Sequence, residues 1–347
     1  MNCFKIYLFF VTVLASATTS SAGQVAFTDP EKAGPDFQVQ GEYVGTIGGV
    51  LPVGVQVIAL GKHEFEGVFF TGGLPGAGWN EGTVFHIKGR THEGETDFHG
   101  IHGDRLKFPH TNFRGSIRGG VFTGEAQTFR NRLEDVTFRL AKVRRSSPTL
   151  GRRPPKRAIV LFDGSSVEEW RNGRIVDDRL LDVNTKSRRD FGSVLIHLEF
   201  RCPFMPTARG MGRGNSGVYV KNEWEVQIVD SFGWHHENRK FERLSGFGRC
   251  GGIHEMVAPR INMSFPPLAW QTYDIEFTMA RFDDSGKKIV PAMMTVLHNG
   301  VVIHDKYVLP RLPPEEDEWQ ERSKGPIYLQ GHGSPVRYRN IWVVERE

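Results

Sequence analysis

The sequence predicts an all-β protein in which a smaller antiparallel β barrel or sandwich precedes a C-terminal two-sheet jelly-roll sandwich. A chain of 347 residues is long for one ordinary domain and suits two. Its 40 glycines and 25 phenylalanines, with few Ala- or Leu-rich stretches, favour strands and turns over helices. Short segments that alternate apolar and polar residues recur along the chain between turn residues, as antiparallel sheets require.

Residues 1–22 have the pattern of a secretory signal peptide. Lys5 supplies the charged start, residues 6–14 form the apolar core, and small residues from Ala15 onward offer cleavage sites. The apolar run is too short to span a bilayer, and no later segment reaches the ~20 apolar residues that spanning needs. We therefore expect an exported protein, periplasmic or extracellular, without a transmembrane segment.

Residues 24–141 are predicted to form the smaller β domain. Short alternating segments such as EYVGTI, VQVIAL, EGVFF and VTFRLAKV follow one another between Gly- and Asn-containing turns, which indicates an up-and-down antiparallel sheet. The turn TGGLPGAGWN carries Trp79. Its indole either stacks on a sugar or packs beneath the loop, and packing is the favoured role. The sequence assigns this domain no function.

Residues 142–157 are predicted to be a solvated basic linker. The run KVRRSSPTLGRRPPKR holds seven Lys or Arg and no acid, and its prolines and glycine prevent a helix or a central strand. Without this run, 37 basic residues face 40 acidic ones, so the rest of the chain is close to neutral. The charge therefore does not support a nucleic-acid-binding face.

Residues 158–347 are predicted to form the jelly roll. Strands are expected near 193–202, 217–220, 223–230, 271–281, 291–298, 301–305, 326–331 and 336–344, and long returns between antiparallel strands indicate two packed sheets. Cys202 and Cys250 remain after export, either as a disulfide or as two separate buried thiols, with the thiols favoured. Their spacing does not suit zinc.

Polar side chains alternate with apolar ones in four of these strands. Because residues two apart share a strand face, each strand has one apolar and one ionisable face. The polar sets are Glu225 with Gln227, His197 with Glu199 and Arg201, Tyr328 with Gln330 and His332, and Arg337 with Arg339. We expect one sheet to present them as a groove for a polyhydroxylated ligand. The alternative is an ordinary solvated face with surface ion pairs.

Several long motifs resemble the 3-keto-disaccharide hydrolase family over essentially all of residues 158–347. These are LFDGSSVEEW, RGNSGVYV, WEVQIVDSFG, CGGIHEMVAPRINMSFPPLAWQTYDIEF, ARFDDSGKKIVPAMMTVLHNGVVIHD and GPIYLQGHGSPVRYRNIWV. The whole chain is similar to secreted planctomycete proteins. The resemblance implies a concanavalin-A-like jelly roll that acts on glycosides oxidised at C3 of the sugar.

The sequence departs from the family pattern at two positions. The family often has an aromatic residue after CGGI, where this chain has His254, and commonly reads LQDHG where this chain has Gly331. If the missing acid orients a ligand, the activity is altered or absent here.

The chemistry that the resemblance implies assigns roles to the polar residues. A 3-keto group acidifies the C2 hydrogen, so a carboxylate base can remove it, while the enolate needs a positive partner and the leaving oxygen a proton. We assign Glu225 as the base, His332 as the acid or enolate partner, and Arg201 or Arg337 as the cation. The substrate-binding candidates are Asn215, Gln227, Gln330, Arg337, Glu199 and Tyr328. No ligand spacing demands a cofactor, although a divalent metal held by Glu225 and His332 stays open.

Two other functions compete with this one. Glu225, Gln227 and Asp230 share the spacing of the laminarinase-type E-x-D-x-x-E motif, although the middle acid is Gln and Asp230 suits a turn cap. A lectin-like carbohydrate-binding module without catalysis uses the same fold. In each case the expected partner is a carbohydrate, and the sequence does not set the oligomeric state.

Overall fold

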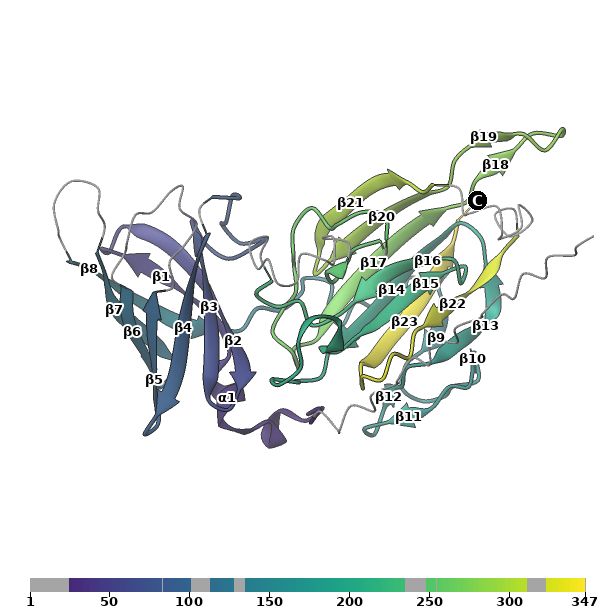
Figure 1. Cartoon of the computed structure of the whole chain (residues 1–347). Coiled ribbons are helices and arrows are strands. Elements are labelled where there is room, and N and C mark those ends of the chain that lie inside the picture. The colour runs from purple at the N-terminus through teal and green to yellow at the C-terminus, as the bar shows by residue number, and fades with distance from the viewer. Residues whose placement is uncertain are drawn as a thin grey trace, which may run out of the picture.

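A computed structural model describes residues 25–82, 84–100, 113–127, 135–234, 248–253, 255–310 and 323–346. Two β domains lie side by side, the N-terminal one in purple and blue and the C-terminal one in green and yellow (Figure 1). The helical segments are short, η1 (Pro30–Lys32), α1 (Gly34–Val39) and η2 (Gly210–Gly212), and no helix in the described ranges is long and apolar enough to cross a membrane. The predicted signal peptide and His254 lie outside the described residues.

The N-terminal domain is a closed eight-stranded barrel, so the barrel form of the prediction is confirmed. Consecutive strands pair antiparallel, and β1 closes the barrel on β8. The strands are β1 (Gly41–Ile47), β2 (Leu51–Gly61), β3 (Glu64–Thr71), β4 (Val84–His92), β5 (Glu95–Gly100), β6 (Phe113–Arg118), β7 (Val121–Gln127) and β8 (Asp135–Val143).

Phenylalanine rings fill the barrel. Phe138 lies edge-on to Phe122 at 5.2 Å between ring centroids and stacks on Phe113 at 5.1 Å. A Cβ atom on Gly124 would come within 2.6 Å of the Phe138 ring, and one on Gly115 within 2.8 Å. Glycine is therefore needed on these two strands to admit the large rings.

The C-terminal domain is a sandwich of two sheets, as predicted. A five-stranded sheet contains, in spatial order, β10 (Trp170–Arg171), β13 (Thr185–Phe191), β22 (Gly325–Leu329), β15 (Ser216–Val220) and β16 (Trp224–Ile228). An eight-stranded sheet contains β11 (Ile175–Val176), β12 (Leu180–Leu181), β23 (Arg337–Glu345), β14 (Val194–Arg201), β17 (Gln271–Thr278), β20 (Met293–His298) and β21 (Val301–Val308), with β9 (Ile159–Phe162) paired to β23. A small ribbon, β18 (Arg281–Phe282) with β19 (Lys288–Val290), extends from it.

The sandwich core forms between the apolar faces of the two sheets. Val226 and Trp224 enter it from β16, while Ile196 and Phe200 enter it from β14. The alternation read from the sequence therefore holds on each strand, and the polar partners point away from the core. Cys202 and Cys250 are both free, buried thiols in the structure.

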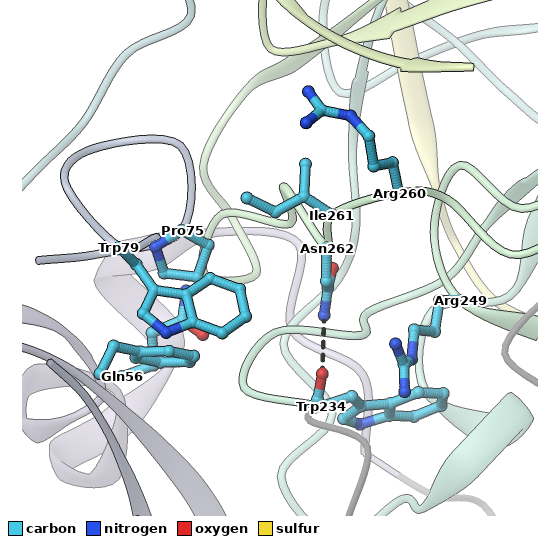
Figure 2. Close-up of a pocket in the computed structure, with 9 residues that line it drawn as sticks. Gln56, Pro75, Trp79, Trp234, Arg249, Arg260, Ile261 and Asn262 are labelled. Carbon is cyan, nitrogen blue, oxygen red and sulfur yellow. Dashed lines mark hydrogen bonds between the residues drawn. The ribbon is translucent and has the colours of Figure 1, made fainter. Parts of the chain in front are cut away.

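The two domains are joined by apolar packing around sandwich loops. Phe204 packs with Phe27 and Phe37 against the barrel core, and its backbone pairs with that of Phe27. Phe232 packs on the outside of the barrel with Ile58 and neighbouring side chains. A cleft lined by both domains lies beside this contact (Figure 2).

Part of the predicted linker is attached to the sandwich. Ser147 is buried, and its hydroxyl lies 2.6 Å from that of Thr272 on β17. The Gly151 amide donates to the Glu199 carboxylate at 2.6 Å. We call residues 147–152 the strap, because they lie across the outer face of the eight-stranded sheet. Residues 151–157 are exposed as expected, but the linker is not a free tether.

Candidate active site

The outer face of the five-stranded sheet carries a compact polar group. Tyr219 on β15 is paired with Glu225 on β16 and, on its other side, with Tyr328 on β22. Two residues further along β15, on the same face of the sheet, Gly217 is opposite Gln227. Since Val218, Val226 and Leu329 belong to the core, these side chains point to the opposite surface.

Glu225 lies on β16, the last strand at one edge of this sheet. Its carboxylate is largely buried, with 5% of the residue exposed, and accepts a hydrogen bond of 2.8 Å from the Tyr219 hydroxyl. A Cβ atom on Gly217 would lie only 2.1 Å from Oε1 of Glu225. The carboxylate therefore leans over a glycine, in space that any other residue would fill.

Tyr219 links Glu225 to the neighbouring strand end. Gln330 Nε2 donates to the Tyr219 hydroxyl oxygen at 3.2 Å, and that hydroxyl donates to Glu225. Burial, followed by the hydrogen bond to Glu225, raises the pKa of Tyr219 well above its usual value. The phenol therefore stays protonated near neutral pH and can orient the carboxylate as a hydrogen-bond donor.

Gln227 and Asn215 are brought together beside this carboxylate. Gln227 Nε2 donates to Asn215 Oδ1 at 2.9 Å and to the Ser216 carbonyl at 2.9 Å. Both side chains are buried, with 1% and 4% of the residue exposed, respectively. Their amides are thus fixed to the hairpin end, next to the Glu225 position.

The other edge of the face is formed by Tyr328 and Lys186. Lys186 on β13 is paired with Tyr328, and its Nζ lies 5.0 Å from the centre of the tyrosine ring. The Tyr328 hydroxyl donates to Asn184 Oδ1 at 3.2 Å. A Cβ atom on Gly331 would lie 2.7 Å from the Asn184 Cβ, so Asn184 crowds the position where the family commonly has an acid.

His332 lies on the loop that follows β22 and is exposed. It shares this end of the strand with Gln330, but its assignment as acid stays a prediction. Among the residues that the structure describes, no group of three or more His, Cys, Asp or Glu side chains is arranged to hold a metal ion.

The expectation that all four polar strands share one face is wrong for Glu199, Arg201 and Arg337. Glu199 and Arg201 lie on β14 and Arg337 on β23, and these strands pair with each other in the eight-stranded sheet. Their side chains point away from the common core and therefore lie on the opposite side of the sandwich from Glu225. Alternation fixes which face of a strand is polar, but it does not fix which sheet the strand joins.

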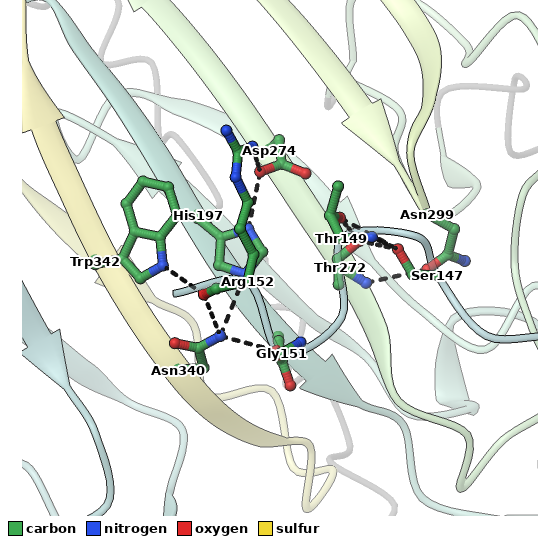
Figure 3. Close-up of polar contacts among 11 residues, drawn as sticks. Ser147, Thr149, Gly151, Arg152, His197, Thr272, Asp274, Asn299, Asn340 and Trp342 are labelled. Carbon is green, nitrogen blue, oxygen red and sulfur yellow. Dashed lines mark hydrogen bonds and ion pairs between the residues drawn. The ribbon is translucent and has the colours of Figure 1, made fainter. Parts of the chain in front are cut away.

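These three residues have structural partners on that side. Glu199 accepts from Arg339 Nε at 2.6 Å, from Asn340 Nδ2 at 2.9 Å and from the strap amide of Gly151. Figure 3 shows Asn340 and Gly151 on this side of the sandwich. Arg337 pairs with Asp177 at 2.6 Å and Asp182 at 2.8 Å.

Arg201 lies 5.0 Å above the Trp270 ring, and burial lowers the pKa of its guanidinium. The ion pairs of the alternative are present on this face, but Glu199 is buried beneath the strap and is not solvated.

Asp230 is held by structural contacts. Its Oδ2 accepts from Arg213 Nη2 at 2.6 Å and from Nε at 3.0 Å, and its Oδ1 accepts from the Phe232 amide at 3.2 Å. The residue therefore caps the turn after β16 and pairs with a buried arginine, which disfavours it as the second acid of a laminarinase-type site.

Sequence reasoning missed Tyr219 and Lys186. The predicted strands 217–220 and 223–230 leave a turn at Lys221 and Asn222, both with positive φ, and this hairpin places Tyr219 opposite Glu225. Lys186 lies in the charged segment TKSRRDF, which lacks the alternation expected of a strand, so the sequence did not predict β13.

Comparisons with known proteins address the sandwich. Residues 157–344 match the model of the 3-keto-alpha-glucoside-1,2-lyase-like domain. A solved structure of a candidate glycosyl hydrolase from Parabacteroides distasonis is 27% identical, covering 55% of this chain and 85% of that one, with a TM-score of 0.46. A second from the same organism is 20% identical, covering 55% and 99%, with a TM-score of 0.38. No curated protein matches the chain.

Proposed function

Because the chain belongs to the 3-keto-alpha-glucoside-1,2-lyase-like domain family, we propose that its sandwich cleaves the glycosidic bond of a glycoside oxidised at C3. The observation that carries this proposal is the Glu225 carboxylate, buried over Gly217 on the polar face of the five-stranded sheet. We further propose that residues 1–22 direct the protein to the periplasm or the exterior, as their pattern suggests.

Glu225 is the proposed base. Its carboxylate takes the C2 proton, and the electron pair that this C–H bond leaves is delocalised onto the C3 oxygen as an enolate. The enolate then expels the C1 oxygen, which leaves a 1,2-unsaturated 3-ketone and an alkoxide that takes up a proton. Addition of water to the double bond completes a net hydrolysis, and without it the reaction ends as an elimination.

The other residues of the face have supporting roles in this reaction. Tyr219 is a positioning residue, because its hydroxyl donates to Glu225 and is itself held by Gln330. Lys186 is the proposed partner of the enolate in place of Arg201, because it lies on the same face as Glu225. His332 is the proposed proton donor to the leaving oxygen.

Incubation of the full-length protein with 3-keto-trehalose or a simple 3-keto-glucoside tests the proposal. Aglycone release, with a transient enone absorbance if elimination comes first, is expected, and Glu225→Gln should reduce turnover by about 10²–10⁴-fold while the ligand still binds. Glu276→Gln, an exposed carboxylate of β17, is the matched control. A parallel arm with chelator tests the metal that the sequence left open.

Two outcomes overturn the proposal. Full turnover by Glu225→Gln would exclude this carboxylate as the base. Ligand binding without turnover by the unchanged protein would identify the sandwich as a lectin-like module.

A further inference from the structure

The cleft between the two domains has the composition of a saccharide-binding site. Figure 2 shows Trp79 on the barrel side, with Trp234 and Arg249 on the sandwich side. Arg260 and Asn262 line the cleft between them. Ligand sites commonly combine aromatic walls with a few fixed polar groups, and this cleft does so with one tryptophan from each domain.

Both indoles are held in place and remain partly accessible. Trp79 is half-buried, packs edge-on against Phe70 at 5.3 Å, and donates from Nε1 to the Gly82 carbonyl at 3.2 Å. Trp234 is also half-buried, and its carbonyl accepts from Asn262 Nδ2 at 3.1 Å. Asn262 thus anchors the turn that presents the second indole.

The two walls are fixed relative to each other by packing between the domains. Gly233, next to Trp234, has φ of 74°, and a Cβ atom there would lie 2.3 Å from Ile58 Cδ1 of the barrel. Arg145 donates to the Pro75 carbonyl of the barrel wall at 2.6 Å and lies 4.9 Å from the centre of the Phe265 ring of the sandwich. A ligand would therefore meet a preformed cleft, which lowers the entropic cost of binding.

The described residues that line the cleft carry a positive charge. Among the described residues that line it, two are arginines and none is acidic. Arg249 lies beside the Trp234 indole (Figure 2), and burial lowers the pKa of its guanidinium. Arg260 is exposed and donates to the Val302 carbonyl at 3.2 Å.

We propose that this cleft binds an acidic saccharide unit, a sugar ring that bears a carboxylate or a sulfate. An indole face accommodates the apolar face of a sugar ring, and a guanidinium matches a carboxylate or sulfate oxygen pair with two parallel hydrogen bonds. This role is additional to the proposed bond cleavage and gives the barrel a function, because Trp79 supplies one wall.

Calorimetric titration of the full-length protein tests the inference with three disaccharides of matched size: one containing glucuronate, one sulfated, and neutral cellobiose. At least one acidic disaccharide should bind about tenfold or more tightly than cellobiose, and less tightly as salt rises. The glucuronate and sulfate arms identify which anion the cleft prefers. Equal affinity for cellobiose, or no acidic binding, overturns the inference.

Variants locate the binding. Arg260→Gln and Arg249→Gln should each weaken acidic binding about tenfold, and Trp79→Ala should weaken it similarly. Arg281→Gln, an exposed arginine of β18, and Trp270→Ala, on the outer face of the eight-stranded sheet, are the matched controls and should bind normally. Equal losses in the controls overturn the assignment. Because Arg260 is exposed, its variant should fold even if others do not.

The cleft and the proposed active site can be separated. Glu225→Gln should bind the acidic disaccharide normally, since Glu225 does not line the cleft. Loss of this binding in Glu225→Gln would place the ligand on the sheet face and overturn the inference, whereas absence of 3-keto-glycoside cleavage would leave it intact.

Discussion

The Glu225 carboxylate lies over Gly217, diagonally across the hairpin from its own position. Glu225 is paired with Tyr219 and Gly217 with Gln227, yet Oε1 of Glu225 lies 2.1 Å from where a Gly217 Cβ would be. Such diagonal contacts are within reach of long side chains on paired strands. Because Gly217 has no side chain, the Glu225 carboxylate can point across the hairpin over it.

We expect Gly217→Ala to lower turnover by about 10²-fold, because the added methyl must displace the carboxylate from its position. Steady-state kinetics with a 3-keto-glycoside measures the effect. Adding Glu225→Asp should restore part of the activity, because a carboxylate one methylene shorter leaves room for the methyl. Unchanged turnover in the single variant would show that this orientation is not needed.

Tyr219→Phe should reduce turnover by about 10- to 100-fold, the effect of one hydrogen bond to a charged group. The pH dependence of turnover should shift as well, because the Glu225 carboxylate loses a hydrogen-bond donor that stabilises its charged form. Tyr307→Phe, a half-buried tyrosine of β21, is the control. If Tyr219→Phe changed only thermal stability, the hydroxyl would have no positioning role.

Glu199→Ala should lower the free energy of unfolding by about 3 kcal/mol, because it leaves buried hydrogen-bond donors and Arg339 without their acceptor. Turnover at a temperature where the variant is folded should not change. Chemical denaturation and kinetics on the same sample separate the two effects. A specific loss of turnover would return this side of the sandwich to the active site.

Acid should destabilise the protein through His298. Burial lowers the pKa of this imidazole to about 3, while in the unfolded chain it is near 6.5. Since only the unfolded state binds the proton between these values, stability is full above pH 6.5 and falls by about 1.4 kcal/mol per unit below it. His304, whose pKa is lowered mainly by burial, adds to the same trend.

Denaturation midpoints measured between pH 4 and pH 8 test this dependence. His298→Gln should flatten the acid limb, since glutamine can keep a bond to Gln271, which His298 contacts at 2.9 Å, without titrating. An unchanged slope in this variant would assign the acid sensitivity to other groups.

Most of the fold could be predicted from period-two alternation, and the candidate site only in part. Glu225 and Gln227 alternate with core residues on β16, and the structure places them outward as expected. Glu199 and Arg201 have the same period on β14 but belong to the other sheet. Pairing between distant strands decides the sheet, and local sequence does not contain that information.

Strands without alternation were beyond sequence reasoning. β13 carries three basic residues and an acid, so it shows no clear apolar face. Because β13 was not predicted, Lys186 was not found as the proposed partner of the enolate. The cleft could not be predicted from the sequence either. Trp79 and Trp234 are far apart in the chain and line one cleft only because one domain packs on the other.

The strap bears on how this protein can be dissected. The family match begins at residue 157, but the Arg152 carbonyl accepts from the Trp342 indole at 3.3 Å and the Asn340 amide at 3.1 Å, across the sheet that also holds buried His197. A fragment that starts at residue 157 would remove this cover and expose to water Trp342 and the buried pair of His197 with Asp274, whose Nδ1 and Oδ1 atoms lie 2.8 Å apart. Fragments intended for crystallisation should therefore start upstream of Ser147. A fragment without the strap would expose these side chains and be less soluble.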